Sequence, residues 1–258
     1  MHIPDGFINA STSLGAGAVA AGGLGVSLRR TAETLQDKQA PLAGLVAAYV
    51  FAVQMLNFPV AAGTSGHLLG GALAAVLVGP WAGSICLAVV LLVQGLLFAD
   101  GGLTALGLNI TNMAIVGTFG GYAAFLLLRR LLPATRSAVG AAAGVAAGVS
   151  VVLASVAFVV EYAIGGTGGA SVGTVVAAMV GVHTLIGIGE GIITALTVGV
   201  VLGVRPDLVY GAAGLQAPLV LEVSPPVAGG SGGLKGSPPV AGGSGGLKGS
   251  PPVDQEVR

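Results

Sequence analysis

Long apolar stretches, separated by short polar segments, dominate the sequence. No Asp, Glu, Lys or Arg occurs between Lys38 and Asp100, and further windows without these residues cover positions 101–128, 137–160 and 162–189. A helix needs about 20 residues to cross a hydrocarbon core of about 30 Å. Each of the windows is long enough, so the pattern predicts an all-α, polytopic membrane helix bundle.

Breaks at proline, glycine clusters and charges divide the apolar sequence into predicted spans. There are seven of them, covering residues 8–28, 41–60, 65–79, 82–99, 106–128, 137–160 and 174–203. The third span is short for a full crossing and the first is rich in glycine, so either could lie inside the bundle. A signal peptide is the competing interpretation of the first span. Signal peptides begin with basic residues, and none precedes Arg29.

Basic residues predict the orientation, because Lys and Arg in short loops stay in the cytoplasm. They follow the first span, separate the fifth and sixth, and follow the seventh: Arg29, Arg30, Lys38, Arg129, Arg130, Arg136 and Arg205. Seven crossings place these groups on one side if the amino terminus is outside and the carboxyl terminus inside. The loops near Asp100 and Glu161 contain no Lys or Arg, as an outside location requires.

Composition supports a membrane protein and limits its partners. Only 8% of the residues are charged, whereas a soluble domain has about 25%. The net charge of zero argues against nucleic acid as a partner. Cys86 is the only cysteine, so the chain can form neither an internal disulfide nor a thiolate cluster for a metal.

A repeat near the carboxyl terminus predicts a second region. The segment SPPVAGGSGGLKG begins at Ser224 and again at Ser237. Proline and glycine at this density cannot form a core. We expect a transmembrane metal-capture domain over residues 1–221 and a disordered tail over residues 222–258, which is either a flexible cytoplasmic tether or a repeat without a role.

Histidine at the second position suggests a metal chelate. The amine of Met1, the amide nitrogen of His2 and its nearer ring nitrogen can close two fused rings on one ion. By the predicted topology His67 lies on the same membrane face and could add a fourth nitrogen. Tetragonal nitrogen sites suit Ni(II) or Cu(II), and imidazole also binds cobalt and zinc. The alternatives are a frayed terminus for His2 and a helix cap for His67.

Other buried polar residues allow a functional or a structural interpretation. His183 and Glu190 are two helical turns apart and therefore share one helix face. Ionisable groups in a membrane indicate function by default, here a proton or metal relay, but they can also fix one helix to its neighbours. Asn57, Asn109 and Asn112 allow the same choice, with hydrogen bonds between helices as the structural alternative.

Five ordered motifs resemble the CbiM/NikM family: MHIPDGF at the start, QMLNFPVAAGTSGHLLGG at 54–71, GPWAG at 79, LLFADGGLTALGLNITNMA at 96–114 and HTLIGIGEGIIT at 183–194. Members of this family are the substrate-capturing S components of energy-coupling factor transporters for cobalt and nickel. The resemblance covers about residues 1–210. It implies a six-helix core with an extra helix at the front, giving seven spans and an outward amino terminus.

The resemblance also implies a site and partners. The metal ligands would be Met1, His2 and His67, holding Ni(II) or Co(II) as transported substrate, with no catalytic cofactor. Partners would be a transmembrane T component, two ATPase subunits and a small accessory membrane subunit of the CbiN or NikN type, in the cell membrane of a bacterium or archaeon. Some relatives continue into a fused accessory domain. In this chain the Pro/Gly repeat follows instead, so we expect the accessory subunit to be a separate protein.

The sequence contains no phosphate loop, no HExxH and no CxxC pair, so we expect a transporter subunit and not an enzyme or an ATPase. The alternative function is a self-sufficient secondary transporter or channel for a divalent cation, using His183 and Glu190. Inverted repeats would favour it, and none is visible. A structural membrane anchor is the third interpretation. The choice between nickel and cobalt stays open.

Overall fold

The computed structural model describes residues 1–34, 39–60 and 65–215. The elements in chain order are α1 (Ala10–Thr34), α2 (Ala40–Gln54), β1 (Phe58–Pro59), β2 (Ser65–Gly66), α3 (Gly71–Val78), α4 (Pro80–Leu97), α5 (Leu106–Asn109), the π-helix η3 (Ile110–Gly117), α6 (Thr118–Leu131), α7 (Arg136–Gly165), α8 (Val172–Val204) and the 3₁₀ turns η4 (Pro206–Leu208) and η5 (Tyr210–Leu215). The predicted tail, the loop at 61–64 and Lys38 lie outside the described residues.

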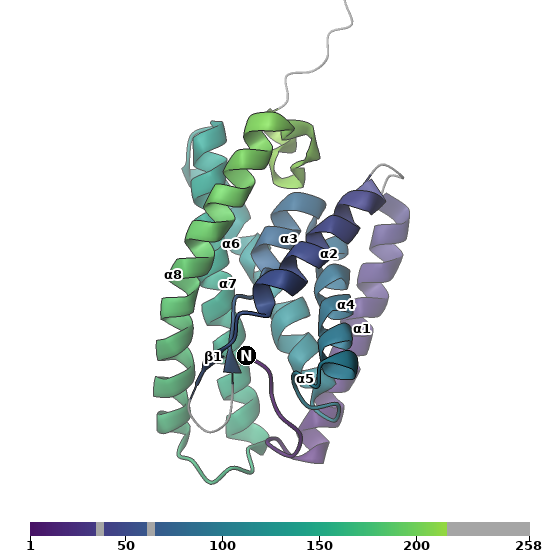
Figure 1. Ribbon diagram of the computed structural model, residues 1–258, viewed down its shortest axis with the longest axis vertical. Helices are drawn as coiled ribbons and strands as arrows, with labels where there is room; N and C mark the ends of the chain where they lie inside the picture. The colour runs from purple at the N-terminus through teal and green to yellow at the C-terminus, as the bar shows by residue number, and fades with distance from the viewer. Residues whose placement is uncertain (35–38, 61–64, 216–258) are drawn as a thin grey trace, which may run out of the picture. The chain divides into compact units, whose positions relative to one another are not determined.

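The predicted all-helical membrane bundle is confirmed (Figure 1). Among the described residues, five helical segments are long and apolar enough to cross a membrane: α1, α4, the run Leu106–Leu131, α7 and α8. Helix α2 is shorter, with 15 residues. The count of seven crossings and the outward amino terminus therefore stay predictions.

The predicted third span, residues 65–79, is wrong as a continuous helix. Its first residues form β2, which pairs antiparallel with β1, so the second predicted span also ends too late. Helix α3 has only 8 residues, all of them buried, and is about 12 Å long. Gly70 and Gly79 flank it with φ angles of +78° and +89°, which favour glycine. The helix lies inside the bundle, one of the two alternatives that the sequence allowed.

Helices α7 and α8 pack closely through glycine. A Cβ atom placed on Gly144 would lie 2.6 Å from the carbonyl oxygen of Gly191, and one on Gly187 would lie 3.0 Å from that of Gly148. Small residues let helix backbones approach in lipid, where apolar burial no longer drives association. This contact places α8 against the helix that faces the amino-terminal segment.

The amino terminus lies among the helices and not on their surface (Figure 1). The chain enters beside the end of α7, where Asn9 N donates to Gly165 O at 2.7 Å and Thr167 N donates to Phe7 O at 3.1 Å. From there, toward its first residue, the segment runs inward to the neighbourhood of β1. Met1 and Ile3 are buried. The fold thus encloses the first residues of the chain.

Candidate metal centre

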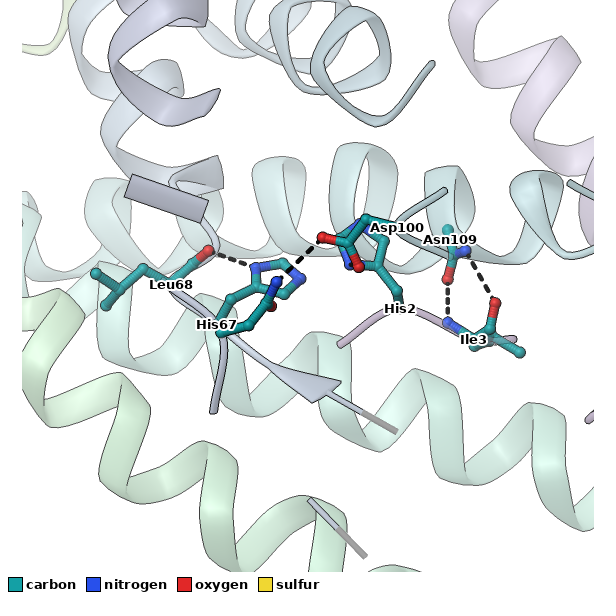
Figure 2. Close-up of polar contacts among 7 residues, drawn as sticks. His2, Ile3, His67, Leu68, Asp100 and Asn109 are labelled. Carbon is teal, nitrogen blue, oxygen red and sulfur yellow. Dashed lines mark hydrogen bonds and ion pairs between the residues drawn. The ribbon is translucent and has the colours of Figure 1, made fainter. Parts of the chain in front are cut away.

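The first residues are held by hydrogen bonds to Ile3 (Figure 2). The side-chain oxygen of Asn109 accepts the Ile3 N–H at 2.8 Å, and its side-chain nitrogen donates to Ile3 O at 3.4 Å. Gly102 N donates to the same carbonyl at 2.8 Å. Both backbone groups of Ile3 are therefore paired inside the protein, as burial requires.

A second contact holds the segment further out. Asp5 Oδ1 accepts the backbone N–H of Thr104 at 2.8 Å and also its hydroxyl. These hydrogen bonds lower the pKa of Asp5. Asp5 and Gly6 form a turn, and Gly6 has a φ angle of +74°. An Asp-Gly pair is typical of a turn, and this turn directs the terminus back into the bundle.

The prediction that His2 and His67 meet is also confirmed. Their ring centroids lie 4.6 Å apart, with an angle of 29° between the planes. Both side chains are buried, with exposed fractions of 4% and 1%. His2 comes from the enclosed amino terminus, and His67 from the short segment between β2 and α3. Their role as metal ligands stays a prediction.

His67 has a defined tautomer. Its Nδ1 lies 2.7 Å from the carbonyl oxygen of Leu68, and because a carbonyl only accepts, Nδ1 must carry the hydrogen. In the neutral ring Nε2 then has a free lone pair, and this buried atom has no hydrogen-bond partner among the described residues. Metal-binding histidines typically donate their second N–H to a carbonyl in this way.

His2 contacts an acidic residue. Its Nδ1 lies 3.1 Å from Asp100 Oδ1, and Asn57 Nδ2 donates to Asp100 Oδ2 at 3.2 Å. The His2 contact lowers the pKa of Asp100. Burial lowers the pKa of His2, and it lowers the pKa of the Met1 amine well below its ordinary value. Burial thus favours the neutral forms, whose lone pairs can bind a metal.

Glu190 and Gln54 hold the segment that carries His67. The two carboxylate oxygens of Glu190 accept the backbone N–H groups of Leu69 and Gly70, the latter at 2.8 Å. Gln54 Nε2 donates to Leu69 O at 2.6 Å. The structural interpretation of Glu190, a polar contact that fixes α8 to its neighbours, is therefore confirmed.

His183 lies on the same helix and is fully buried. Its Nδ1 lies 2.7 Å from Met179 O, and its Nε2 has no hydrogen-bond partner in the part of the chain that the structure describes. The side chain borders the His67 segment, since its Cε1 lies 3.7 Å from the position of a Cβ on Gly66. The structure thus places His183 beside the segment, without joining it to Glu190.

Side chains alone do not form a metal site among the described residues. In these ranges, no three His, Cys, Asp or Glu side chains come close enough together to hold a metal ion. The His2 ring lies against the His67 ring, and the adjacent residue, Met1, is buried. A terminal chelate completed by one separate imidazole stays a prediction.

Sequence reasoning did not identify several residues around this centre. The sequence indicates only a loop charge at Asp100. It gives no signal for Gln94, which is buried and whose amide atoms have no partner among the described residues. For Asn112 the structural alternative, a hydrogen bond between helices, is correct, since it donates to Glu161 Oε2 at 2.6 Å. Asn109 binds the amino-terminal segment instead.

Fold and site together define a class: an integral membrane protein that encloses a nitrogen-rich centre formed by its own amino terminus. Residues 2–208 match the family model described as the cobalt uptake substrate-specific transmembrane region, CbiM. The chain belongs to this family. It is a membrane component of a transporter for cobalt or nickel uptake.

Individual relatives agree with this assignment. A putative metal transport protein of Haloquadratum walsbyi is 38% identical over 81% of this chain and 94% of its own. A putative fused nickel transport protein NikMN of Archaeoglobus fulgidus is 42% identical over 81% of this chain and 68% of its own. The crystal structure of a truncated transition metal transporter superposes with a TM-score of 0.73 at 30% identity, covering 79% of this chain and 99% of that one.

Proposed function

We propose that the protein is the S component of an energy-coupling factor importer and captures Ni(II) or Co(II) from outside the cell membrane. The ion is held by the Met1 amine, the amide nitrogen and Nδ1 of His2, and Nε2 of His67. To bind the ion, Nδ1 of His2 leaves its contact with Asp100 Oδ1, 3.1 Å away. One observation carries the proposal: the buried contact of the His2 and His67 rings, 4.6 Å apart, at an enclosed amino terminus.

The chemistry of these donors fits a divalent transition metal. The amine and amide nitrogen close a five-membered ring on the ion, and the amide nitrogen and Nδ1 of His2 close a six-membered one. His67 supplies the fourth nitrogen through the lone pair that its tautomer leaves on Nε2. A planar set of four nitrogen donors favours nickel on ligand geometry. The site requires that Met1 is retained and carries no formyl group.

Transport from this site requires partners. The sequence contains no phosphate loop, so ATP hydrolysis is assigned to two ATPase subunits that act through a transmembrane T component. The names of the NikMN relatives from Archaeoglobus fulgidus and Rhodobacter capsulatus support an accessory N subunit. Reorientation of the bundle by these partners would expose the centre to the cytoplasm.

The alternative, a secondary transporter that uses His183 and Glu190, is less well supported. Both oxygens of Glu190 accept backbone N–H groups at the start of α3. A carboxylate in these hydrogen bonds serves to hold the His67 segment, and it would have to leave them to bind an ion. The geometry therefore favours capture at the amino terminus.

Titration calorimetry of the detergent-purified protein with Ni(II) and Co(II) tests the proposal. We expect one ion per chain, and a loss of affinity of at least about 100-fold when Ala is inserted between Met1 and His2 or when His67→Ala removes the separate imidazole. Gly181→Ala is the control, because a Cβ there meets no other atom within 4 Å. Unchanged binding in both altered proteins would refute the site.

A further inference from the structure

Asn109 makes an unusual contact for a buried asparagine in a membrane helix. Its own backbone N–H bonds to Ala105 O at 3.0 Å, so its side chain is not needed to complete the helix. That side chain, 2% exposed, pairs instead with the N–H and the carbonyl of Ile3 (Figure 2). A helix position at the end of α5 thus holds one particular residue of the amino-terminal segment.

The residue that is held lies next to the chelate. Ile3 N belongs to the peptide bond that follows His2, so fixing it also fixes where the main chain of His2 ends. We propose that Asn109 is a positioning residue that sets the register of the amino-terminal chelate against His67. This inference rests on the proposed function and adds to it the residue, Asn109, that fixes the position of the metal donors Met1 and His2.

The distances involved show why register matters. A shift of one residue moves an extended chain by about 3.5 Å, whereas metal–nitrogen distances tolerate deviations of about 0.2 Å. The Met1 and His2 nitrogens form a chelate at any position of the segment, because they belong to adjacent residues. Only the correct register brings His67 Nε2 within bonding distance of the same ion.

The outer contacts of the segment do not provide the same control. Asp5 and Thr104 are exposed, and their hydrogen bonds lie on the other side of Pro4 from the chelate. Gly6 is exposed, and a Cβ there meets no atom within 4 Å. An additional residue after Gly6 would disturb the turn contact between Phe7 N and Pro4 O at the surface, while Ile3 and Asp5 keep their contacts.

Two pairs of variants of the full chain test the proposal. One glycine is inserted between His2 and Ile3, and in the matched control one glycine is inserted after Gly6. Asn109→Leu removes the contact to Ile3, and Thr111→Val is its control, because it removes a nearby hydrogen bond to Ala16 O, at 2.9 Å, without touching the segment.

The probes are Ni(II) in titration calorimetry and Cu(II) in electron paramagnetic resonance, which reports the number of bound nitrogens. For the insertion before Ile3 and for Asn109→Leu we expect affinity at least about tenfold weaker and a Cu(II) spectrum with fewer than four nitrogens. Both controls should keep the wild-type affinity and spectrum.

The results separate this proposal from the function on which it rests. If wild-type binding does not depend on a free amino terminus, the proposed function fails. If it does depend on it, but Asn109→Leu keeps the four-nitrogen spectrum, the role of Asn109 is overturned, even where the variant melts at a lower temperature. Should Asn109→Leu not fold, the insertion pair decides: equal spectra in the two inserted chains would contradict control at Ile3.

Discussion

The position of one hydrogen decides what each histidine can do. His67 and His183 both place Nδ1 2.7 Å from a backbone carbonyl oxygen, so both rings have Nε2 free of the hydrogen. Only His67 stacks on His2 at the amino terminus. A fixed tautomer needs no rearrangement when a metal arrives, so under the proposed function the His67 ring would bind the ion without changing its tautomer.

Burial of the donors leads to a prediction about pH. Protons compete with a metal for the Met1 amine and the His2 ring, and burial lowers the pKa of both groups. A lower pKa means that protonation begins at a lower pH. We therefore expect the Ni(II) affinity of the protein to fall less steeply than that of the free peptide Met-His-Ile as the pH falls from about 7.5 to about 6.

The comparison is made by Ni(II) titration of both molecules in the same buffers. The proton released from the His2 amide affects protein and peptide alike, so the difference between the two curves reports the effect of enclosure. Parallel curves would contradict the prediction, because they would show that the donors are as accessible to protons as in the peptide.

At the scale of the elements, the contact between α7 and α8 depends on glycine. A Cβ on Gly191 would lie 2.9 Å from Gly144 O, whereas one on Gly189 meets nothing within 4 Å. We expect Gly191→Ala to separate the helices and to destabilise the protein by about 1–3 kcal/mol, and Gly189→Ala to leave its stability unchanged or slightly higher. Thermal unfolding in detergent measures both, and equal melting temperatures would contradict the packing described.

Apolar pattern predicted the long helices well, because a charge-free window marks a crossing wherever it occurs. The predicted spans 137–160 and 174–203 correspond to α7 and α8, and each helix is longer at both ends than its predicted span. The pattern failed at residues 65–79, because interior protein and lipid select the same apolar residues, so hydropathy cannot distinguish a buried segment from a crossing. The π-helix at Ile110–Gly117 depends on backbone hydrogen bonds, which hydropathy does not record.

The site could be predicted only in part. The contact of His2 with His67 followed from topology, since both were placed on one membrane face. The partners Asp100 and Asn109 could not be assigned in this way, because they depend on which side chains the folded loops bring to the first residues. The sequence offered one sign that Asn109 has a special role, namely that it is a polar residue within an apolar stretch.

At the scale of the molecule, Arg136 and the entry of the amino-terminal segment lie at opposite ends of α7. Arg136 begins α7 and Gly165, which contacts the amino-terminal segment, ends it. The helix has 30 residues, which corresponds to about 45 Å. By the positive-inside rule we therefore expect the Gly165 end to face outward.

Cysteine labelling tests this orientation. In a Cys86→Ala background, single cysteines replace the exposed residues Leu103, near the centre, and Ala134, at the other end. We expect a membrane-impermeant maleimide to label Leu103→Cys in intact cells, and Ala134→Cys only after permeabilisation. The reverse pattern would place the amino terminus inside.

The enclosed amino terminus also constrains the order of assembly. Ile3 is held by residues near position 100, and His2 lies against His67, so the partners of the first residues are synthesised long after them. The earliest part of the chain to leave the ribosome can reach its final place only once α4 and α5 exist. Insertion of the amino-terminal segment into the bundle is therefore a late step of biogenesis, which follows the synthesis of α5.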